Sequence, residues 1–283
     1  MLAITGSTGA VGGRVARALA DDFRNDVRLV VRDPARAPDY DTDVRVCEYA
    51  DHAAAVAALT GVDTLFMVSA AEAVDRRDQH RTFIRAAADA GVHHIVYTSF
   101  AGAAPDATFT LGRDHWDAEQ AIRESGMTST FLRDNFYSDL LPFFADEHGV
   151  IRGPAGEGRV AAVARADIAD VADIATAVLR SPADHAHATY VLTGPEALTL
   201  TEVAARAGAV LGRSLSFVDE TDEEAYASRR AAYGAEDWQL DAWVSTYTAI
   251  RDGSCAEVSG DVERVSGHPA RTLEQALQAA GPA

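Results

Sequence analysis

Short apolar runs alternate with amphipathic stretches along the first half of the chain. The apolar runs have the length and composition of buried strands, while Val11, Val15 and Leu19 recur at the spacing of a helix face. Alternation of this kind indicates βαβ units, a parallel sheet and helices on both of its faces. We therefore predict an α/β fold with a Rossmann-type doubly wound parallel sheet. The predicted strands are Leu2–Thr5, Val27–Val31, Val44–Cys47, Thr64–Ser69, His94–Thr98 and Thr128–Leu132.

The pattern changes in the second half of the chain. Residues Gly149–Gly158 are rich in Gly and Pro and predict a loop, and from Ser214 on the chain is mostly helical in pattern, acidic and aromatic. The other predicted elements are a helix marked by Ile168, Val171, Ile174 and Val178, a strand at Tyr190–Thr193, and a helix from the capping box Thr199–Glu202 to about Leu211.

The composition of the 283 residues narrows the function classes. Hydrophobic residues make up 48% of the chain, which is enough for a real core, and the net charge is -18 with a pI of about 4.8. Such a surface repels nucleic-acid phosphates and anionic lipids, so we predict a small-molecule substrate and neither nucleic-acid nor membrane binding. The chain has no apolar run of membrane-spanning length and no signal core, so we expect a cytoplasmic location. A homodimer is left open.

All 25 basic residues are arginine. Without lysine, the chain can form no Schiff base, no Walker A phosphate loop and no Tyr-x-x-x-Lys dyad. The two cysteines, Cys47 and Cys255, form no CxxC pair, and His185 with His187 lacks an evident third ligand. We therefore predict no metal site.

A glycine-rich turn follows the first predicted strand and opens a helix. Gly6 permits the sharp turn, Gly9 lets the backbone approach a pyrophosphate, and Gly12 allows the helix to lie close to the sheet. The amides and the positive end of the helix dipole then meet the phosphates. The predicted cofactor-binding residues of this turn are Gly6, Ser7, Thr8, Gly9, Ala10, Val11 and Gly12.

The end of the second predicted strand bears on cofactor choice. Arg32 stands where an NAD-selective site has an acid, and a guanidinium there pairs with a 2′-phosphate. Asp33 follows, so the alternative is a solvated Arg32 with Asp33 on the ribose. We favour NADPH, with NADH left open, and Arg36 is a candidate helper.

Further candidates come from the ends of the next strands, the sheet edge where α/β proteins bind ligands. Asp51 either accepts from the adenine amino group or caps the helix that begins near His52, and the sequence favours neither reading. Ser69, Ala70, Thr98 and Ser99 end the fourth and fifth predicted strands. We predict that the NAD(P)-binding Rossmann core comprises residues 1–135, completed by about 160–195, and that 136–159 and 196–283 form a smaller, mostly helical substrate-binding region.

Several of these segments together resemble the NmrA-like atypical short-chain dehydrogenase/reductase family, and the resemblance covers nearly the whole chain. Within the family, the chain is most similar to bacterial NAD(P)H:quinone oxidoreductases and triphenylmethane reductases. The resemblance implies NADPH binding, hydride transfer, and a place near nicotinamide or substrate for Thr98, Asn135, Phe136 and Tyr137. The segments that carry it are Gly6–Gly13, Val31–Arg36, Tyr97–Ser99, Phe131–Tyr137, Ser69–Glu72, Asp78–Arg81, Arg165–Asp167 and Gly267–Pro269.

One departure from ordinary short-chain dehydrogenases matters for the chemistry. His115 and Glu119 occupy the positions of the Tyr and Lys of the dyad. His115 is the best candidate proton donor, because its ordinary pKa lies near neutrality; the alternative is a structural histidine. Tyr137 either bonds a quinone oxygen or is a core aromatic. Asn135 either holds a substrate oxygen or caps a helix, and Phe136 either packs or stacks on substrate.

The residues together predict an NADPH-dependent reductase that transfers hydride to a quinone or a similar conjugated acceptor. Such an acceptor needs little acid help, which suits a site without the dyad. The alternatives are a non-catalytic NADP(H)-binding redox sensor and a reductase of a specialised metabolite.

Overall fold

The computed structural model describes residues 1–20, 22, 26–165 and 170–280. The chain forms two compact units. The first unit comprises Met1–Phe100, Asp114–Arg133 and Val171–Tyr190, and the second comprises Ala101–Arg113, Asp134–Asp170 and Val191–Ala283. Ile168, Ala166 and Asp167, on which the sequence analysis drew, lie outside the described residues.

A seven-stranded sheet forms the centre of the first unit, in the order β3-β2-β1-β4-β5-β6-β9. The pairs from β3 to β5 are parallel. The bonds from Phe131 N–H to Ala188 O and from Asn135 N–H to Leu192 O advance in step along both chains, so β6 and β9 are parallel as well. The strands are β1 (Leu2–Thr5), β2 (Val27–Val31), β3 (Asp43–Val46), β4 (Thr64–Met67), β5 (His94–Phe100), β6 (Thr128–Asp134) and β9 (Thr189–Leu192).

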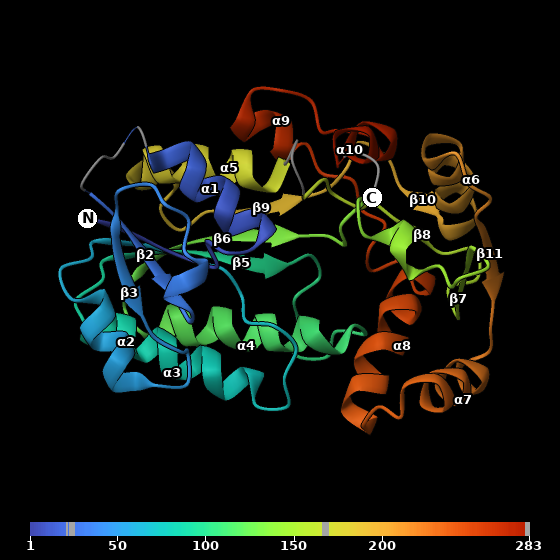
Figure 1. The fold of residues 1–283 in the computed structure, drawn as a ribbon, viewed down its shortest axis with the longest axis horizontal. Helices are drawn as coiled ribbons and strands as arrows, with labels where there is room; N and C mark the ends of the chain where they lie inside the picture. Colours follow the sequence, from blue (N-terminus) through green and yellow to red (C-terminus); the bar gives the residue numbers. More distant parts are fainter. Residues whose placement is uncertain (21, 23–25, 166–169, 281–283) are drawn as a thin grey trace. The chain divides into compact units, whose positions relative to one another are not determined.

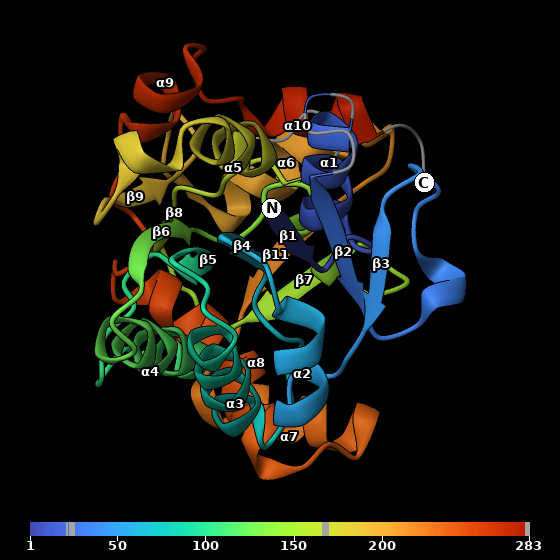
Figure 2. The ribbon, with the colours of Figure 1, turned by 90° about the vertical axis from the view of Figure 1, so that its left-hand side faces the viewer.

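Helices cover both faces of this sheet, as Figures 1 and 2 show. On one face lie α1 and α5, and on the other α2, α3 and α4. The doubly wound Rossmann-type fold predicted from the sequence is confirmed. These helices, with two short 3-10 turns, are α1 (Ala10–Ala20), η1 (Pro34–Arg36), α2 (His52–Leu59), α3 (Arg76–Asp89), α4 (Thr110–Glu124), α5 (Asp170–Arg180) and η3 (Pro182–His185).

The hydrophobic pattern accounts for these positions. Strands β1, β2 and β5 are buried along their whole length, as parallel strands between two helix layers must be. Val11, Val15 and Leu19 form the buried face of α1, as predicted, and the predicted bounds of β1 and β2 are confirmed.

The second unit combines helices with two small sheets. Strand β7 pairs with β11 in parallel, and β8 pairs with β10 in antiparallel orientation. The elements are η2 (Leu141–Phe144), β7 (Val150–Gly153), β8 (Arg159–Val160), β10 (Leu198–Thr199), α6 (Leu200–Leu211), β11 (Ser216–Asp219), α7 (Asp222–Tyr233), α8 (Asp237–Arg251), α9 (Asp261–Ser266) and α10 (Leu273–Ala280).

The sequence prediction for this unit is partly confirmed. The capping box of Thr199 and Glu202 opens α6, and the helix ends at Leu211 as predicted. The predicted loop Gly149–Gly158 is wrong in part, because it contains β7. Strand β11, which pairs with β7, was missed as well. Both strands have only four residues, so neither gives a measurable alternation on its own.

The turn between β1 and α1 depends on two glycines. Gly6 has a φ of +65°, which glycine adopts without strain. A Cβ on Gly12 would lie 2.5 Å from the Gly6 carbonyl oxygen and 2.7 Å from that of Thr5. Because Gly12 lacks a side chain, the first turn of α1 lies directly against the end of β1.

Gly12→Ala should therefore destabilise the protein by about 1–3 kcal/mol, as overpacking does. The clash with backbone oxygens outweighs the helix propensity that Ala gains, which is at most about 1 kcal/mol. Gly9→Ala is the matched control, since its Cβ would meet only the Gly6 oxygen, at 3.4 Å. Chemical unfolding of both variants and the parent measures the difference; equal stability of Gly12→Ala and Gly9→Ala would contradict this account.

Candidate functional site

A cavity of about 390 Å³ opens at the carboxyl ends of β1 to β4 in the first unit. Chain connections diverge here, since β2 and β4 lie on opposite sides of β1. Open α/β sheets bind ligands at such a point. This carboxyl-edge cavity is lined by residues that leave the ends of four strands and by the start of α3: Thr5, Gly6, Thr8, Val30, Val31, Arg32, Cys47, Glu48, Tyr49, Ala50, Val68, Ser69, Ala70, Ala71, Glu72, Ala73, Asp75 and Gln79.

The glycine turn forms one wall of the cavity. The first intrahelical bond of α1 runs from Gly13 N–H to the Gly9 carbonyl, so the amides of Ala10, Val11 and Gly12 have no acceptor within the helix. The Ser7 hydroxyl is buried and has no hydrogen-bond partner among the described residues. This wall therefore presents donors and the positive end of the helix dipole, as an anion site requires.

A hydrogen-bonded clamp fixes the strand ends around the cavity. The Tyr49 hydroxyl donates to the Val68 carbonyl at 2.7 Å and lies 2.6 Å from the Thr5 hydroxyl oxygen, which accepts from Val68 N–H at 2.9 Å. The ring of Tyr49 stacks on Phe83 at a centroid distance of 4.1 Å. Burial raises the pKa of Tyr49, so it stays a neutral donor.

Arg32 and Asp33 differ in their surroundings, since only Arg32 lines the cavity and Asp33 caps a 3-10 turn. Arg32 is exposed and lines the cavity. Asp33 turns away from it, because its carboxylate caps η1 by accepting from Ala35 N–H at 3.0 Å. This geometry favours the first of the two predicted readings.

Asp51 is the N-cap of α2 and accepts from Ala54 N–H at 3.0 Å. The structure thus shows the capping alternative. Ala50, its neighbour, lines the cavity. Contact of Asp51 with an adenine stays a prediction.

The loop of residues 68–75, which joins β4 to α3, forms the opposite wall. Its backbone is fixed by three side chains. Thr98 accepts from Ser69 N–H at 2.8 Å, His80 Nε2 accepts from Ala70 N–H at 2.9 Å, and Arg76 Nε donates to the Ala70 carbonyl at 2.9 Å. His80 is fully buried and its pKa is lowered to about 3, mainly by desolvation, so it is a neutral acceptor.

His115 lies buried behind this loop, between Arg76 and Tyr97. Its Nε2 is 3.1 Å from Arg76 Nη2, and its Nδ1 is 3.1 Å from the Tyr97 hydroxyl. Desolvation, followed by the charge of Arg76, holds the pKa of His115 well below its ordinary value. The predicted proton donor therefore carries no imidazolium proton at neutral pH.

Glu119, at the second dyad position, is fully buried and paired. It accepts two hydrogen bonds from Arg133, at 2.8 and 2.7 Å, one from Arg123 at 3.0 Å and one from the Ser99 hydroxyl at 2.6 Å. Ser99 thus bonds to Glu119 rather than facing the cavity. Both dyad positions hold internal polar networks.

The remaining predicted residues lie in the second unit. Asn135 is buried and caps no helix: its Oδ1 accepts from Phe136 N–H at 2.8 Å and its Nδ2 donates to the Cys255 carbonyl at 2.9 Å. The Phe136 ring contacts Phe109 edge to face at 5.1 Å. Substrate contacts of both residues stay predictions.

Tyr137 and Asp134 form a buried pair in the same unit. The Tyr137 hydroxyl donates to Asp134 Oδ2 at 2.9 Å, and the guanidinium of Arg165 lies 5.2 Å from the tyrosine ring centre. Burial raises the pKa of Asp134 to about 8 despite the hydrogen bond from Tyr137, and burial together with the Asp134 charge raises the pKa of Tyr137. Asp134 Oδ1 has no partner among the described residues.

Comparison with known proteins agrees with this arrangement. The family model described as NmrA-like family matches residues 1–249. The chain belongs to the NmrA-like family. Its relatives include quinone oxidoreductase 2 of Escherichia coli, which is 33% identical over 98% of this chain and 97% of that protein. The (4-alkanoyl-5-oxo-2,5-dihydrofuran-3-yl)methyl phosphate reductase of Streptomyces griseus is 37% identical over 96% of this chain and 94% of that protein.

The fold agrees with a solved member of this group. The crystal structure of the Escherichia coli NADPH-dependent quinone oxidoreductase complexed with NADPH matches with a TM-score of 0.87 and 33% identity. The match covers 98% of this chain and 99% of that one. The predicted resemblance to the NmrA-like family is confirmed.

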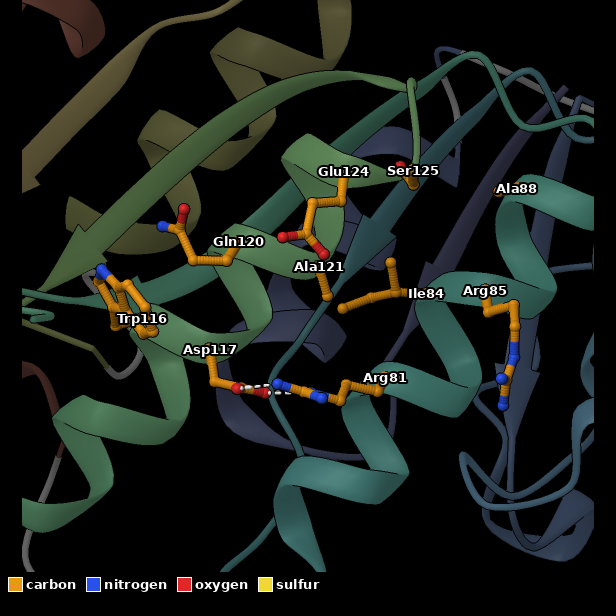
Figure 3. Close-up of a pocket in the computed structure, with 10 residues that line it drawn as sticks. All are labelled: Arg81, Ile84, Arg85, Ala88, Trp116, Asp117, Gln120, Ala121, Glu124 and Ser125. Carbon is orange, nitrogen blue, oxygen red and sulfur yellow. Dashed lines mark hydrogen bonds and ion pairs between the residues drawn. The ribbon is translucent and has the colours of Figure 1, made fainter. Parts of the chain in front are cut away.

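A second hollow of this NmrA-like chain lies apart from the strand ends. A groove of about 460 Å³ lies between α3 and α4, and Figure 3 shows the residues that line it. Arg81 and Asp117 pair across it, with a bond of 2.7 Å from Arg81 Nε, and Ile84 and Ala121 lie in it. The groove residues lie from Arg81 onward in α3 and from Trp116 to Ser125 in α4 and just after it, whereas the carboxyl-edge cavity meets only the start of α3.

The sequence missed three residues that shape the carboxyl-edge cavity: Tyr49, Arg76 and His80. Arg76 and His80 stand four residues apart, on the buried face of α3 with Phe83 and Ile84. Polar residues on an apolar helix face need buried hydrogen-bond partners. The positions of Arg76 and His80 on such a face were therefore the sequence signal for a buried polar network. Among the described residues, no cluster suited to a metal and no helix fit to cross a bilayer is found.

The pKa of Asp134 predicts a pH dependence of stability. From its ordinary value of 3.8 up to about 8, the folded chain keeps a proton on Asp134 that the unfolded chain has lost. The free energy of unfolding should therefore fall as pH rises from about 5 to 8. Asp134→Asn should lose less stability over that range than the parent.

Thermal unfolding at several pH values measures this difference. Asp106→Asn, which changes an exposed acid of the same unit, is the control and should follow the parent. Parallel pH curves for Asp134→Asn and the parent would refute the assignment of a buried, protonated Asp134.

Proposed function

We propose that this protein is an NADPH-dependent reductase that transfers hydride to a quinone or a similar conjugated acceptor. The carboxyl-edge cavity is the observation that carries the proposal, because it combines the glycine turn with Arg32 at the ends of parallel strands. The bound nicotinamide would supply the hydride, so that one NADPH and one proton are consumed per hydroquinone formed.

The residues present fit a dinucleotide. Gly9 has no side chain, so the space above the turn stays open for the pyrophosphate. A Cβ at Gly9 would meet only the Gly6 oxygen. The amides of Ala10, Val11 and Gly12 and the unpartnered Ser7 hydroxyl would hold the pyrophosphate. Arg32 would meet the 2′-phosphate, since Asp33 is engaged in its cap. Ser69 and Ala70 would line the path toward the nicotinamide.

The acceptor is proposed to be conjugated because both dyad positions are engaged elsewhere. Buried His115 has both ring nitrogens engaged and Glu119 is paired, so neither is placed to protonate a carbonyl oxygen as hydride arrives. A quinone tolerates this, since its reduction needs little acid help. The name of the Streptomyces griseus relative describes another conjugated ring, a dihydrofuranone with an added alkanoyl group. A reductase of a specialised metabolite of that kind is the second candidate.

We assign contacts with the acceptor to the second unit. Tyr137 is proposed to donate to an acceptor oxygen in place of its bond to Asp134, with Asn135 and Phe136 as neighbours along the chain. The smaller substrate-binding region predicted from the sequence, the homodimer and the cytoplasmic location are carried forward as proposals. A non-catalytic sensor role is not favoured, because the two relatives described above are named as an oxidoreductase and a reductase.

Turnover tests the proposal directly. The protein should consume NADPH in the presence of benzoquinone and leave an unactivated ketone such as cyclohexanone unreduced. The measurement is the loss of NADPH absorbance. Binding of NADPH without turnover on any member of a quinone and enone panel would contradict the reductase and support the sensor.

Arg32→Ala tests cofactor choice. Loss of a charge-assisted contact with the 2′-phosphate should raise the KM for NADPH about tenfold or more, while the KM for NADH changes less than about twofold. Arg85→Ala, which removes an exposed arginine from α3, is the control and should change neither value. Equal losses for both cofactors in Arg32→Ala would exclude the 2′-phosphate contact.

A further inference from the structure

A chain of buried hydrogen bonds connects the first dyad position to the wall of the carboxyl-edge cavity. It runs from Tyr97 through His115 and Arg76 to the carbonyl of Ala70. Arg76 is only 4% exposed, and His115 is 7% exposed. Ala70 itself lines the cavity. The four residues belong to the first unit.

Hydrogen-bond chemistry fixes the tautomer of His115. A guanidinium only donates, so the Nε2 atom that lies 3.1 Å from Arg76 Nη2 must present a lone pair. The proton of the neutral ring is then on Nδ1, which lies 3.1 Å from the Tyr97 hydroxyl oxygen. A protonated His115 would instead place an N–H and a second positive charge against Arg76.

Arg76 needs this acceptor to keep its orientation. Its Nη1 lies 3.4 Å from Asp114 Oδ2, which is a long contact, and Asp114 is shared with Arg77 at 2.6 Å. The His115 bond is the shorter of the two contacts made by the Arg76 terminal nitrogens. Because the guanidinium is planar, fixing its end also fixes the direction of Nε.

We propose that His115 is a positioning residue, whose Nε2 lone pair holds the Arg76 guanidinium so that Arg76 Nε fixes the Ala70 carbonyl in the cavity wall. The inference rests on the proposed function only in assigning that wall to NADPH. The residue at the tyrosine position of the dyad thus shapes the cofactor site and takes no part in proton transfer.

The charges around His115 agree with a ring that stays neutral. Desolvation and the Arg76 charge are the main causes that hold its pKa well below the ordinary value, and a backbone hydrogen bond with Thr98 acts in the opposite direction. The pH profile of turnover should therefore owe nothing to His115. The titratable and charged groups that face the network are Tyr49, Arg76, His80, Tyr97, Asp114, Glu119 and Arg133.

Two substitutions separate positioning from proton donation. His115→Leu removes the acceptor and keeps an apolar side chain, whereas His115→Gln offers an oxygen to Arg76. His115→Leu should raise the KM for NADPH about tenfold, change kcat less than about twofold and leave the shape of the kcat pH profile unchanged. His115→Gln should bring the KM back to within about threefold of the parent.

Two kinetic outcomes would overturn the inference. A fall in kcat of about a hundredfold with a changed pH profile would make His115 a proton donor. Failure of His115→Gln to recover the KM would reduce His115 to a packing residue. A combination with Arg76→Lys adds a check, since His115→Leu should then raise the KM no further.

Amide hydrogen exchange across residues 68–76 gives a readout that needs no cofactor. Exchange should become faster in His115→Leu and should match the parent in His115→Gln, because the Ala70 carbonyl is released only in the first. Unchanged exchange in both variants would refute the positioning role. If the parent neither binds nor oxidises NADPH, the proposed function fails while this exchange result still decides the inference.

Discussion

Close contact between two backbones, at the end of β1 and the start of α1, underlies both the fold and the site. Because Gly12 has no Cβ, the first turn of the helix lies against the carbonyls of Thr5 and Gly6. The free amides of that turn then meet the carboxyl edge of the sheet, where the cavity opens. A chain with a net charge of -18 repels anions at a distance. Amides in direct contact act over a shorter range, so local geometry decides what binds here.

The sequence predicts those parts of the fold whose burial follows one clear rule. Strands β1 and β2 are buried on both faces, and their apolar runs gave their bounds to the residue. Strands β7 and β11 escaped prediction because each has four residues and the two pair with each other across more than sixty positions of the chain. Short, partly exposed strands carry no alternation long enough to measure, so tertiary pairing decides them.

The candidate site divides in the same way. Gly6, Thr8, Arg32, Ser69 and Ala70 line the cavity, as the rule of strand carboxyl ends predicts. Tyr49, Arg76 and His80 escaped prediction, because their places follow from hydrogen bonds between distant segments, such as that of Ala70 with His80. For Asp51 and Asp33, the sequence allowed the carboxylate either to contact the cofactor or to stay out of the cofactor site. Capping bonds that form only in the folded loop show one of these uses for each carboxylate, and contact of Asp51 with an adenine stays a prediction.

His115 and Glu119 stand at the two dyad positions, and the buried polar groups around them stabilise the structure instead of supplying a proton. A buried cation and a buried carboxylate are costly unless they are fully paired, and here Arg76 and Glu119 each bond to several partners. Their networks fix the loop before α3 and the ends of β5 and β6, and they engage both dyad positions, His115 and Glu119. Hydride transfer without an acid at the dyad positions suits an acceptor that is easily reduced, such as a conjugated ring. The Arg76 network that engages His115 therefore also fixes a wall of the carboxyl-edge cavity.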